Sequence, residues 1–125
     1  SLQTEADFIQ HYISLLNIRY KNVLEISMNI SKAGMEKGIV MVTLQMLIDN
    51  AIKHNSLETE APLTIGIWDE EGYLNISNNK QLRRQIETSN KQGLAQLKEL
   101  YSYLTKQEVK IQESPEKFEI KLPLL

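Results

Sequence analysis

The stretch from Leu44 to Asn55, LQMLIDNAIKHN, constrains the fold more than any other part of the chain. At about 100° per residue in a helix, its large apolar residues gather on one contiguous face; these are Leu44, Leu47, Ile48, Ala51 and Ile52. Asp49, Asn50 and Lys53 share the opposite side, with His54 at its edge. The pattern predicts a core helix that carries one compact polar cluster.

The polar cluster combines residue types that can hold a nucleotide triphosphate. Asn50 offers a carbonyl oxygen to a hard cation such as Mg²⁺, and Lys53 offers a point charge to phosphate. Asp49 is a base that can orient a water or hydroxyl proton. An Asp–Lys pair four residues apart is also an ordinary feature of solvated helix surfaces, so these residues alone leave both interpretations open.

Length and composition predict one domain with one core. The chain has 125 residues, 42% hydrophobic and 24% charged, as is ordinary for a globular protein. The net charge of −2 gives no basic field for nucleic acid. The absence of cysteine excludes a disulfide scaffold, a zinc finger and thiol catalysis.

The sequence contains no apolar run near the roughly 18 residues that a membrane helix needs, so we expect no membrane contact by these residues. Helical character is already present at Leu2 and Glu5. We therefore expect the chain to be part of a longer protein.

Periodicity along the chain predicts three helices and five strands. The helices are expected over residues 3–20, with Thr4 as N-cap, over 42–55 or 43–55, and over 93–105. The strands are expected over residues 23–30, 63–68, 73–77, 108–112 and 117–122. In the first helix, the residues at helical spacing are Phe8, Tyr12, Leu15, Leu16 and Arg19.

The connections carry three further expectations. Residues 31–38 contain two glycines and are expected to form a loop. Residues 69–72, DEEG, are expected to be the turn of a hairpin. Residues 78–92 are polar and long for a loop in a compact domain, which is typical of a functional or disordered segment. Its cations, Lys80, Arg83 and Arg84, are candidates for phosphate contact, although a solvated loop without that role is the other interpretation.

The order of helix, strand, helix, hairpin, long loop, helix and hairpin favours an α+β fold. We expect a two-layer sandwich, in which a mixed five-stranded sheet carries about three helices on one face.

The stretch 44–55 resembles the N-box of the ATP-binding domain of sensor histidine kinases, in the superfamily shared with gyrase and MutL. It is most similar to the LytS-like branch, whose box reads roughly LQ-x-L-[VI]-[ED]-NAIKH. The matching residues are Leu44, Gln45, Leu47, Asp49, Asn50, Ala51, Ile52, Lys53 and His54. The element order also agrees, so residues 1–20 resemble the helical segment leading in from a phosphoacceptor region, and residues 21–125 resemble the ATP-binding domain.

Two other elements depart from the family pattern. Where the family has Asp-x-Gly-x-Gly, whose carboxylate binds the adenine amino group, this chain has Asn78 in the Asp position and no glycine. A carboxamide oxygen can accept the same hydrogen bond, but more weakly than a charged group; a strand-end Asn that only makes a turn is the other interpretation.

The family's Gly-x-Gly-Leu element begins a helix under the phosphates. Here Lys91 replaces the first glycine, and Gly93 and Leu94 are kept at the expected start of the last helix. Reduced nucleotide affinity is the expected consequence.

The resemblance implies that the domain binds ATP with Mg²⁺. It assigns the Mg²⁺ ligand to Asn50, phosphate contacts to Lys53 and His54, and the adenine amine to Asn78. It assigns Asp49 the task of orienting or deprotonating the attacking histidine. That histidine is expected outside the fragment, before residue 1, so His11 is not assigned the role and the fragment alone is expected to be inactive.

The resemblance further implies a parent protein that is a homodimer of the inner membrane, with this domain in the cytoplasm. Its partners would be the phosphoacceptor and dimerisation helices of the parent and a response regulator. The altered elements leave a second functional class open, a degenerate kinase-like domain that no longer binds ATP and acts as a signalling interaction module. A gyrase- or MutL-type ATPase would need a longer chain with a second domain.

Overall fold

Five strands form one open mixed sheet in the order β1-β2-β3-β5-β4. The computed structural model describes residues 1–40, 43–55, 57, 59–80 and 90–125. The strands are β1 (Leu24–Asn29), β2 (Leu63–Glu70), β3 (Tyr73–Asn79), β4 (Lys110–Glu113) and β5 (Lys117–Pro123). β1 pairs with β2 in parallel, and the other neighbours are antiparallel.

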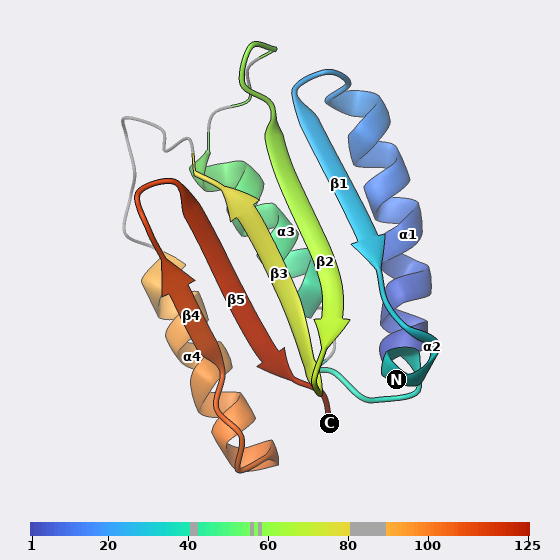
Figure 1. Ribbon diagram of the computed structural model, residues 1–125, viewed down its shortest axis with the longest axis vertical. Coiled ribbons are helices and arrows are strands. Elements are labelled where there is room, and N and C mark those ends of the chain that lie inside the picture. The colour runs from blue at the N-terminus through green and yellow to red at the C-terminus, as the bar shows by residue number, and fades with distance from the viewer. Residues whose placement is uncertain (41–42, 56, 58, 81–89) are drawn as a thin grey trace.

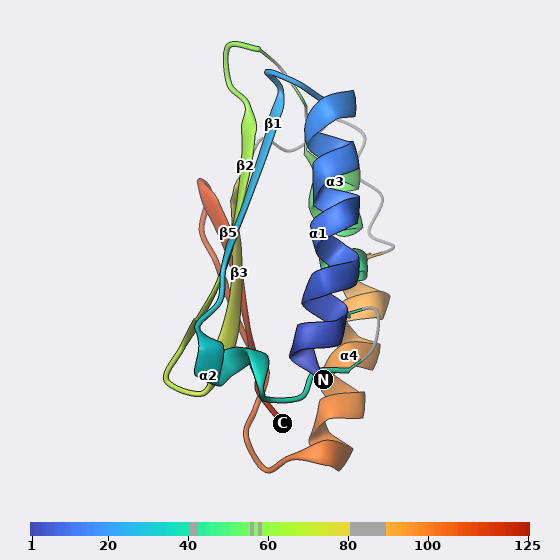
Figure 2. The ribbon, with the colours of Figure 1, turned by 90° about the vertical axis from the view of Figure 1, so that its right-hand side faces the viewer.

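The helices form the second layer. They are α1 (Leu2–Arg19), the short α2 (Lys32–Met35), α3 (Thr43–His54) and α4 (Asn90–Leu104). Figure 2 shows α1, α3 and α4 on one side of the sheet, and Figure 1 shows α3 between the other two. The predicted two-layer α+β sandwich, with about three helices on one face, is confirmed.

One apolar core fills the space between the two layers. It is built from alternating strand residues and from one face of each long helix, including Ile9, Ile13, Leu44, Ile48, Ile65, Ile67, Leu74, Tyr101 and Ile120. On β3, Leu74 and Ile76 point into this core. Asn78 follows at the same two-residue period, so it also lies on the helix-facing side of the sheet.

The first helix is confirmed, but its cap and its buried face differ from expectation. The N-cap is Ser1, whose hydroxyl accepts a hydrogen bond from the backbone N–H of Thr4; Thr4 itself lies in the first turn. Phe8 and Leu15 are 55% and 66% exposed. The buried face of α1 is formed by Leu2, Glu5, Ala6, Ile9, Ile13 and Leu16, of which only Leu16 belonged to the predicted stripe. The interpretation of residues 1–20 as a lead-in segment stays a prediction.

The expectation of a plain loop over residues 31–38 was wrong, because α2 forms there. Its N-cap is Ser31, and a carboxylate distant in sequence holds this cap in place. Asp69 accepts hydrogen bonds from the backbone N–H of Ser31 at 2.6 Å and from its hydroxyl at 2.5 Å, which lowers the pKa of the Asp69 carboxyl. A Cβ added at Gly34 would lie 2.5 Å from Asp69 Oδ2, so glycine permits this close approach.

The hairpin turn is shorter than predicted. β2 continues through Asp69 and Glu70, and only Glu71 and Gly72 form the turn, with φ of 51° and 81°. Positive φ at both central residues is the requirement of a type I′ turn, whose twist matches that of the flanking strands. Asp69 therefore belongs to the strand, from which it can reach α2.

The last helix begins at Asn90, three residues before the expected start. Most of the predicted long loop, residues 81–89, lies outside the described residues. None of the described helices is both long enough and apolar enough to span a membrane.

Candidate functional site

The predicted polar cluster lies on the outer side of α3, but it is divided between two flanks of that helix. Leu44 and Ile48 point into the core with 0% exposure. Asp49 lies on the flank toward α1, since it accepts a hydrogen bond from the hydroxyl of Tyr12. Asn50 comes about 100° further around the helix, away from α1.

The flank that carries Asn50 faces α4. Thr43 precedes Asn50 by seven residues, which places the two on the same side of the helix two turns apart. Thr43 is buried next to the hydroxyl of Tyr101, a residue of α4. Asn50 is half-buried on this side, and among the described residues nothing hydrogen-bonds its amide.

Lys53 projects between the two flanks and is exposed. The described residues form ion pairs elsewhere, between Lys80 and Glu113 and between Lys117 and Glu119, but none with Lys53. The ordinary Asp49–Lys53 surface pair is therefore not formed. His54 is the last residue of α3, and its side chain lies outside the described part of the structure.

Tyr12 was not predicted as a site residue, yet it is the described partner of Asp49. Burial, the hydrogen bond to Asp49 and the negative charge of Asp49 together raise the pKa of Tyr12 to about 12. The hydroxyl consequently stays protonated at physiological pH and donates to the carboxylate. The sequence signal was weak, because Tyr12 reads as one more apolar residue of the first helix.

Asn78 lies at the end of β3, is 6% exposed and faces the helix layer. Its amide nitrogen donates to the carbonyl of Asn79 at 2.8 Å, so its amide oxygen is the atom available to accept a further bond. Figure 1 shows the C-terminal end of α3 at the same end of the molecule as the end of β3. The helix that carries Asn50 and the strand that carries Asn78 therefore end at the same end of the molecule.

The neighbouring Asn79 has a structural task. Its amide oxygen accepts from the backbone N–H of Thr64 at 2.7 Å, and its amide nitrogen donates to the carbonyl of Pro62 at 3.1 Å. These bonds tie the end of β3 to the start of β2. Asn78 also bonds locally, to the carbonyl of Asn79, so both interpretations of Asn78, adenine contact and shaping of the strand end, stay predictions.

Gly93 and Leu94 lie within the first turns of α4 and not at its beginning. Residue 91 has helical backbone geometry here, for which glycine is not required. Leu94 is half-buried and packs against the core. The first backbone N–H groups of the helix belong to residues 90–93, which is where free N–H donors are expected.

Lys80, the first cation of the predicted long loop, forms an ion pair with a residue of the sheet. Lys80 donates to Glu113 Oε2 of β4 at 2.6 Å, and its side chain is only 10% exposed. Arg83 and Arg84 lie outside the described residues.

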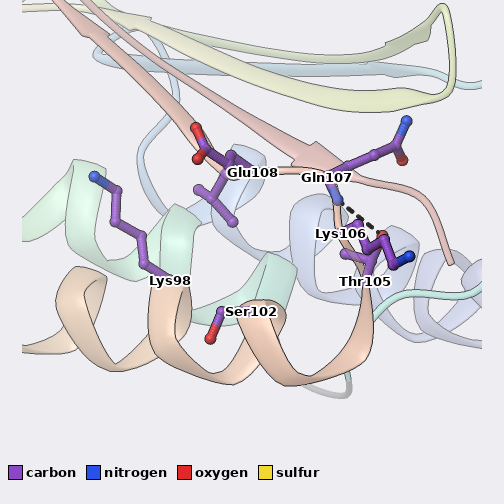
Figure 3. A pocket seen from close by; sticks show the side chains of 7 residues that line it. Lys98, Ser102, Thr105, Lys106, Gln107 and Glu108 are labelled. Carbon is purple, nitrogen blue, oxygen red and sulfur yellow. Dashed lines mark hydrogen bonds between the residues drawn. The ribbon is translucent and has the colours of Figure 1, made fainter.

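Two further observations bear on ligands. A hollow of about 560 Å³ lies at the C-terminal half of α4, lined by Lys98, Ser102, Thr105, Lys106, Gln107, Glu108 and Val109. Figure 3 shows these side chains, and none of them is a predicted site residue. Within the described ranges, no three His, Cys, Asp or Glu side chains come together to hold a metal. A cation beside Asn50 would need most of its oxygens from a ligand such as a triphosphate.

No family model matches the sequence. Half of the chain, 64 residues, is 31% identical to the sensor protein kinase HptS of Staphylococcus aureus, in strains USA300 and NCTC 8325 among others. The match covers 51% of this chain and only 12% of that kinase.

Solved structures give the wider comparison. A blue-light activated histidine kinase of Erythrobacter litoralis superposes with a TM-score of 0.56 over 96% of this chain and 42% of its own, at 11% identity. The catalytic domain of histidine kinase ThkA superposes with a TM-score of 0.53 over 94% and 90% of the two chains, at 12% identity. The fold is that of a histidine kinase catalytic domain. The match to ThkA spans nearly all of both chains.

Proposed function

We propose that this domain binds ATP with Mg²⁺ and presents the γ-phosphate to a histidine that lies outside residues 1–125, from which the phosphoryl group passes to a response regulator. Asn50 would hold Mg²⁺, Lys53 and His54 the phosphate oxygens, and Asn78 the adenine amine. Because the curated relatives are matched over only 12% of their length, the activity of the whole kinase is part of the proposal.

The placement of Asn50 supports the proposal most. A half-buried amide with no hydrogen-bond partner among the described residues has an oxygen to give to a ligand. Mg²⁺ in proteins is commonly held by one or two side-chain oxygens together with substrate phosphates and water. One amide ligand from α3 therefore suits a cation that arrives with a triphosphate.

The remaining residues would complete a cleft between α3, the end of β3 and the start of α4. Lys53 is exposed and unpaired by any described ion pair, so its charge is available to phosphate. The free N–H groups at the start of α4, in residues 90–93, would face negative charge favourably because of the helix dipole, and Leu94 would anchor this turn on the core.

The residues of this chain would act by positioning the reactants and by neutralising charge on the phosphates, as in other phosphoryl transfers. Mg²⁺, when bound, would neutralise charge on the phosphates. Asp49, on the opposite flank of α3, would accept the proton of the attacking imidazole. Asn78, being neutral, would hold adenine more weakly than a carboxylate does.

The context of the domain follows from the same proposal. The phosphoacceptor and dimerisation helices would belong to the parent protein, which would be a homodimer of the inner membrane with this domain in the cytoplasm. The LytS-like subtype is part of the proposal and is supported by the N-box residues of α3.

The test is calorimetric titration of residues 1–125 with ATP, in the presence of Mg²⁺ and again with EDTA. Wild type is expected to bind Mg-ATP, and Asn50→Ala to weaken binding by about tenfold or more, a loss of about 1.4 kcal/mol. The Asn50→Ala effect should disappear in EDTA, since the lost ligand serves the cation.

The matched control is Asn29→Ala, which removes an exposed amide at the end of β1 and should leave the affinity unchanged. Absence of binding by wild type at millimolar Mg-ATP would contradict the proposal. That result would favour the degenerate interaction module instead.

A further inference from the structure

One hydrogen bond joins the helix that begins the chain to the carboxylate of the N-box helix. The hydroxyl of Tyr12, in the middle of α1, donates to Oδ1 of Asp49, which lies 37 residues later on α3. Tyr12 is half-buried between the two helices, whereas Asp49 is exposed. The side chain that fixes the carboxylate is thus set in the packed layer, and the carboxylate itself faces outward.

This arrangement engages only one of the two carboxylate oxygens. With Oδ1 held by Tyr12, Oδ2 is the oxygen that can accept a hydrogen bond from a group approaching the exposed flank. A hydrogen bond to an ionised carboxylate is stronger than one between neutral groups, so it fixes the orientation of the side chain more firmly. A free Asp at an exposed helix position would rotate among its staggered conformers.

We propose that Tyr12 is a positioning residue of the phosphoryl-transfer reaction, because it fixes Asp49 so that Oδ2 receives the imidazole proton of the attacking histidine. The proposal rests on the proposed function of the domain. In the reaction, the unprotonated imidazole nitrogen forms a bond to the γ-phosphorus, and the bond from that phosphorus to the β-bridging oxygen breaks. ADP leaves with the electron pair of that bond, and the proton of the opposite imidazole nitrogen passes to Asp49.

Tyrosine suits this task because it remains a donor throughout. Its pKa is raised to about 12, first by burial and then by the bond to Asp49 and its charge. It therefore does not lose its proton at physiological pH, and Asp49 remains the group of the pair that accepts one. A lysine in the same place would form an ion pair and make the carboxylate a poorer proton acceptor.

The test is the rate of histidine phosphorylation in a sensor kinase that contains residues 1–125, measured with labelled ATP. Tyr12→Phe removes the hydroxyl and keeps the ring. It is expected to lower kcat by about tenfold, the scale of one hydrogen bond to a charged group, and to leave KM for ATP unchanged, because Asn50 lies on the other flank. Tyr103→Phe, at a position that is 78% exposed on α4, is the matched control and should leave kcat unchanged.

A double-mutant comparison tests whether Tyr12 acts by positioning Asp49 or by stabilising the fold in general. Asp49→Asn alone should lower kcat further than Tyr12→Phe, by about 10²-fold or more if Asp49 is the base. Adding Tyr12→Phe to Asp49→Asn should then cost nothing more in kcat, because Tyr12 acts only through the carboxylate.

Two results would overturn the role of Tyr12: a wild-type kcat in Tyr12→Phe, or losses that multiply in the double variant. Mg-ATP titration of residues 1–125 keeps this test distinct from that of the proposed function. If wild type and Tyr12→Phe both bind Mg-ATP and kcat is unaffected, only the Tyr12 role fails. If wild type does not bind Mg-ATP, the proposed function fails and the Tyr12 role fails with it.

Discussion

The two flanks of α3 differ in how far their polar groups are already engaged within the protein. On the flank toward α1, Asp49 accepts a hydrogen bond from Tyr12. On the flank toward α4, no described residue hydrogen-bonds the half-buried amide of Asn50. One helix thus presents a carboxylate whose position is fixed by the fold and an amide that is left for a ligand. Adjacent residues of one motif can therefore serve different partners, one inside the protein and one outside it.

Both flanks of α3 depend on the packing of its inward face against the core. We therefore expect the largest effect from a substitution on that face. Ile48 is 0% exposed, and Ile48→Ala should lower the free energy of unfolding by about 2–5 kcal/mol through lost burial and the cavity left behind. Chemical denaturation measures the change. Ile18→Ala, at a site that is 75% exposed on α1, is the control and should stay within about 0.5 kcal/mol of wild type. Equal losses in the two variants would contradict the packing described for α3.

The hydrogen bond between Tyr12 and Asp49, on the α1 flank of α3, can be tested by itself at alkaline pH. The folded-state pKa of Tyr12 is about 12 against an ordinary value of 10.0, so the protonated hydroxyl stabilises the folded state. That stabilisation is fully present below pH 10 and is lost as the pH rises from 10 to 12. The difference in unfolding free energy between wild type and Tyr12→Phe should shrink over this window. Tyr103→Phe serves as the control, and a constant difference for Tyr12→Phe across the window would contradict the bond to Asp49.

The smallest expected effect concerns Asp69, which lies apart from both flanks of α3. Its substitution tests whether ligand binding at α3 depends on the cap of α2. The pKa of Asp69 is lowered from 3.8 by its bonds to Ser31. Asp69 therefore stabilises the fold above pH 3.8, and this contribution is lost as the pH falls below that value. Asp69→Asn should cost about 1 kcal/mol at neutral pH, the scale of a helix cap, and less in acid.

Glu70→Gln, an exposed neighbour on the same strand, is the control for Asp69→Asn and should cost less. Mg-ATP affinity should be the same in both variants. A loss of affinity in Asp69→Asn would show that α2 and α3 are coupled.

Much of the fold could be predicted from the sequence because its signals are local. The apolar residues of α3 lie on one face at helical spacing, and the strands of the two hairpins alternate, so both element types and their order were readable. The two-residue turn at Glu71 and Gly72 was placed in the right segment but made too long. Strand pairing through Glu70 decided its true length, and pairing is set by the partner strand.

Two of the missed features, the cap of α2 and the partner of Tyr12, depend on residues that are far apart in the sequence. The short helix α2 was predicted as a loop, and its cap is held by Asp69, which lies 38 residues later. The start of α4 was placed three residues late because Asn90, Lys91 and Gln92 give no apolar period. Tyr12 was counted as an apolar helix residue, although a half-buried tyrosine usually finds a partner for its hydroxyl.

The sequence by itself determined that residues 44–55 form a helix with one apolar face and one polar side, because helical geometry fixes the angle between neighbouring side chains. Only the tertiary structure decided what each polar residue meets. α1 packs on one flank of α3 and places Tyr12 beside Asp49, whereas Asn50 faces the opposite side, on which Tyr101 of α4 lies beside Thr43. A helix sets the direction of its side chains by local geometry. The groups that those side chains contact belong to other elements, whose positions depend on the packing of the whole domain.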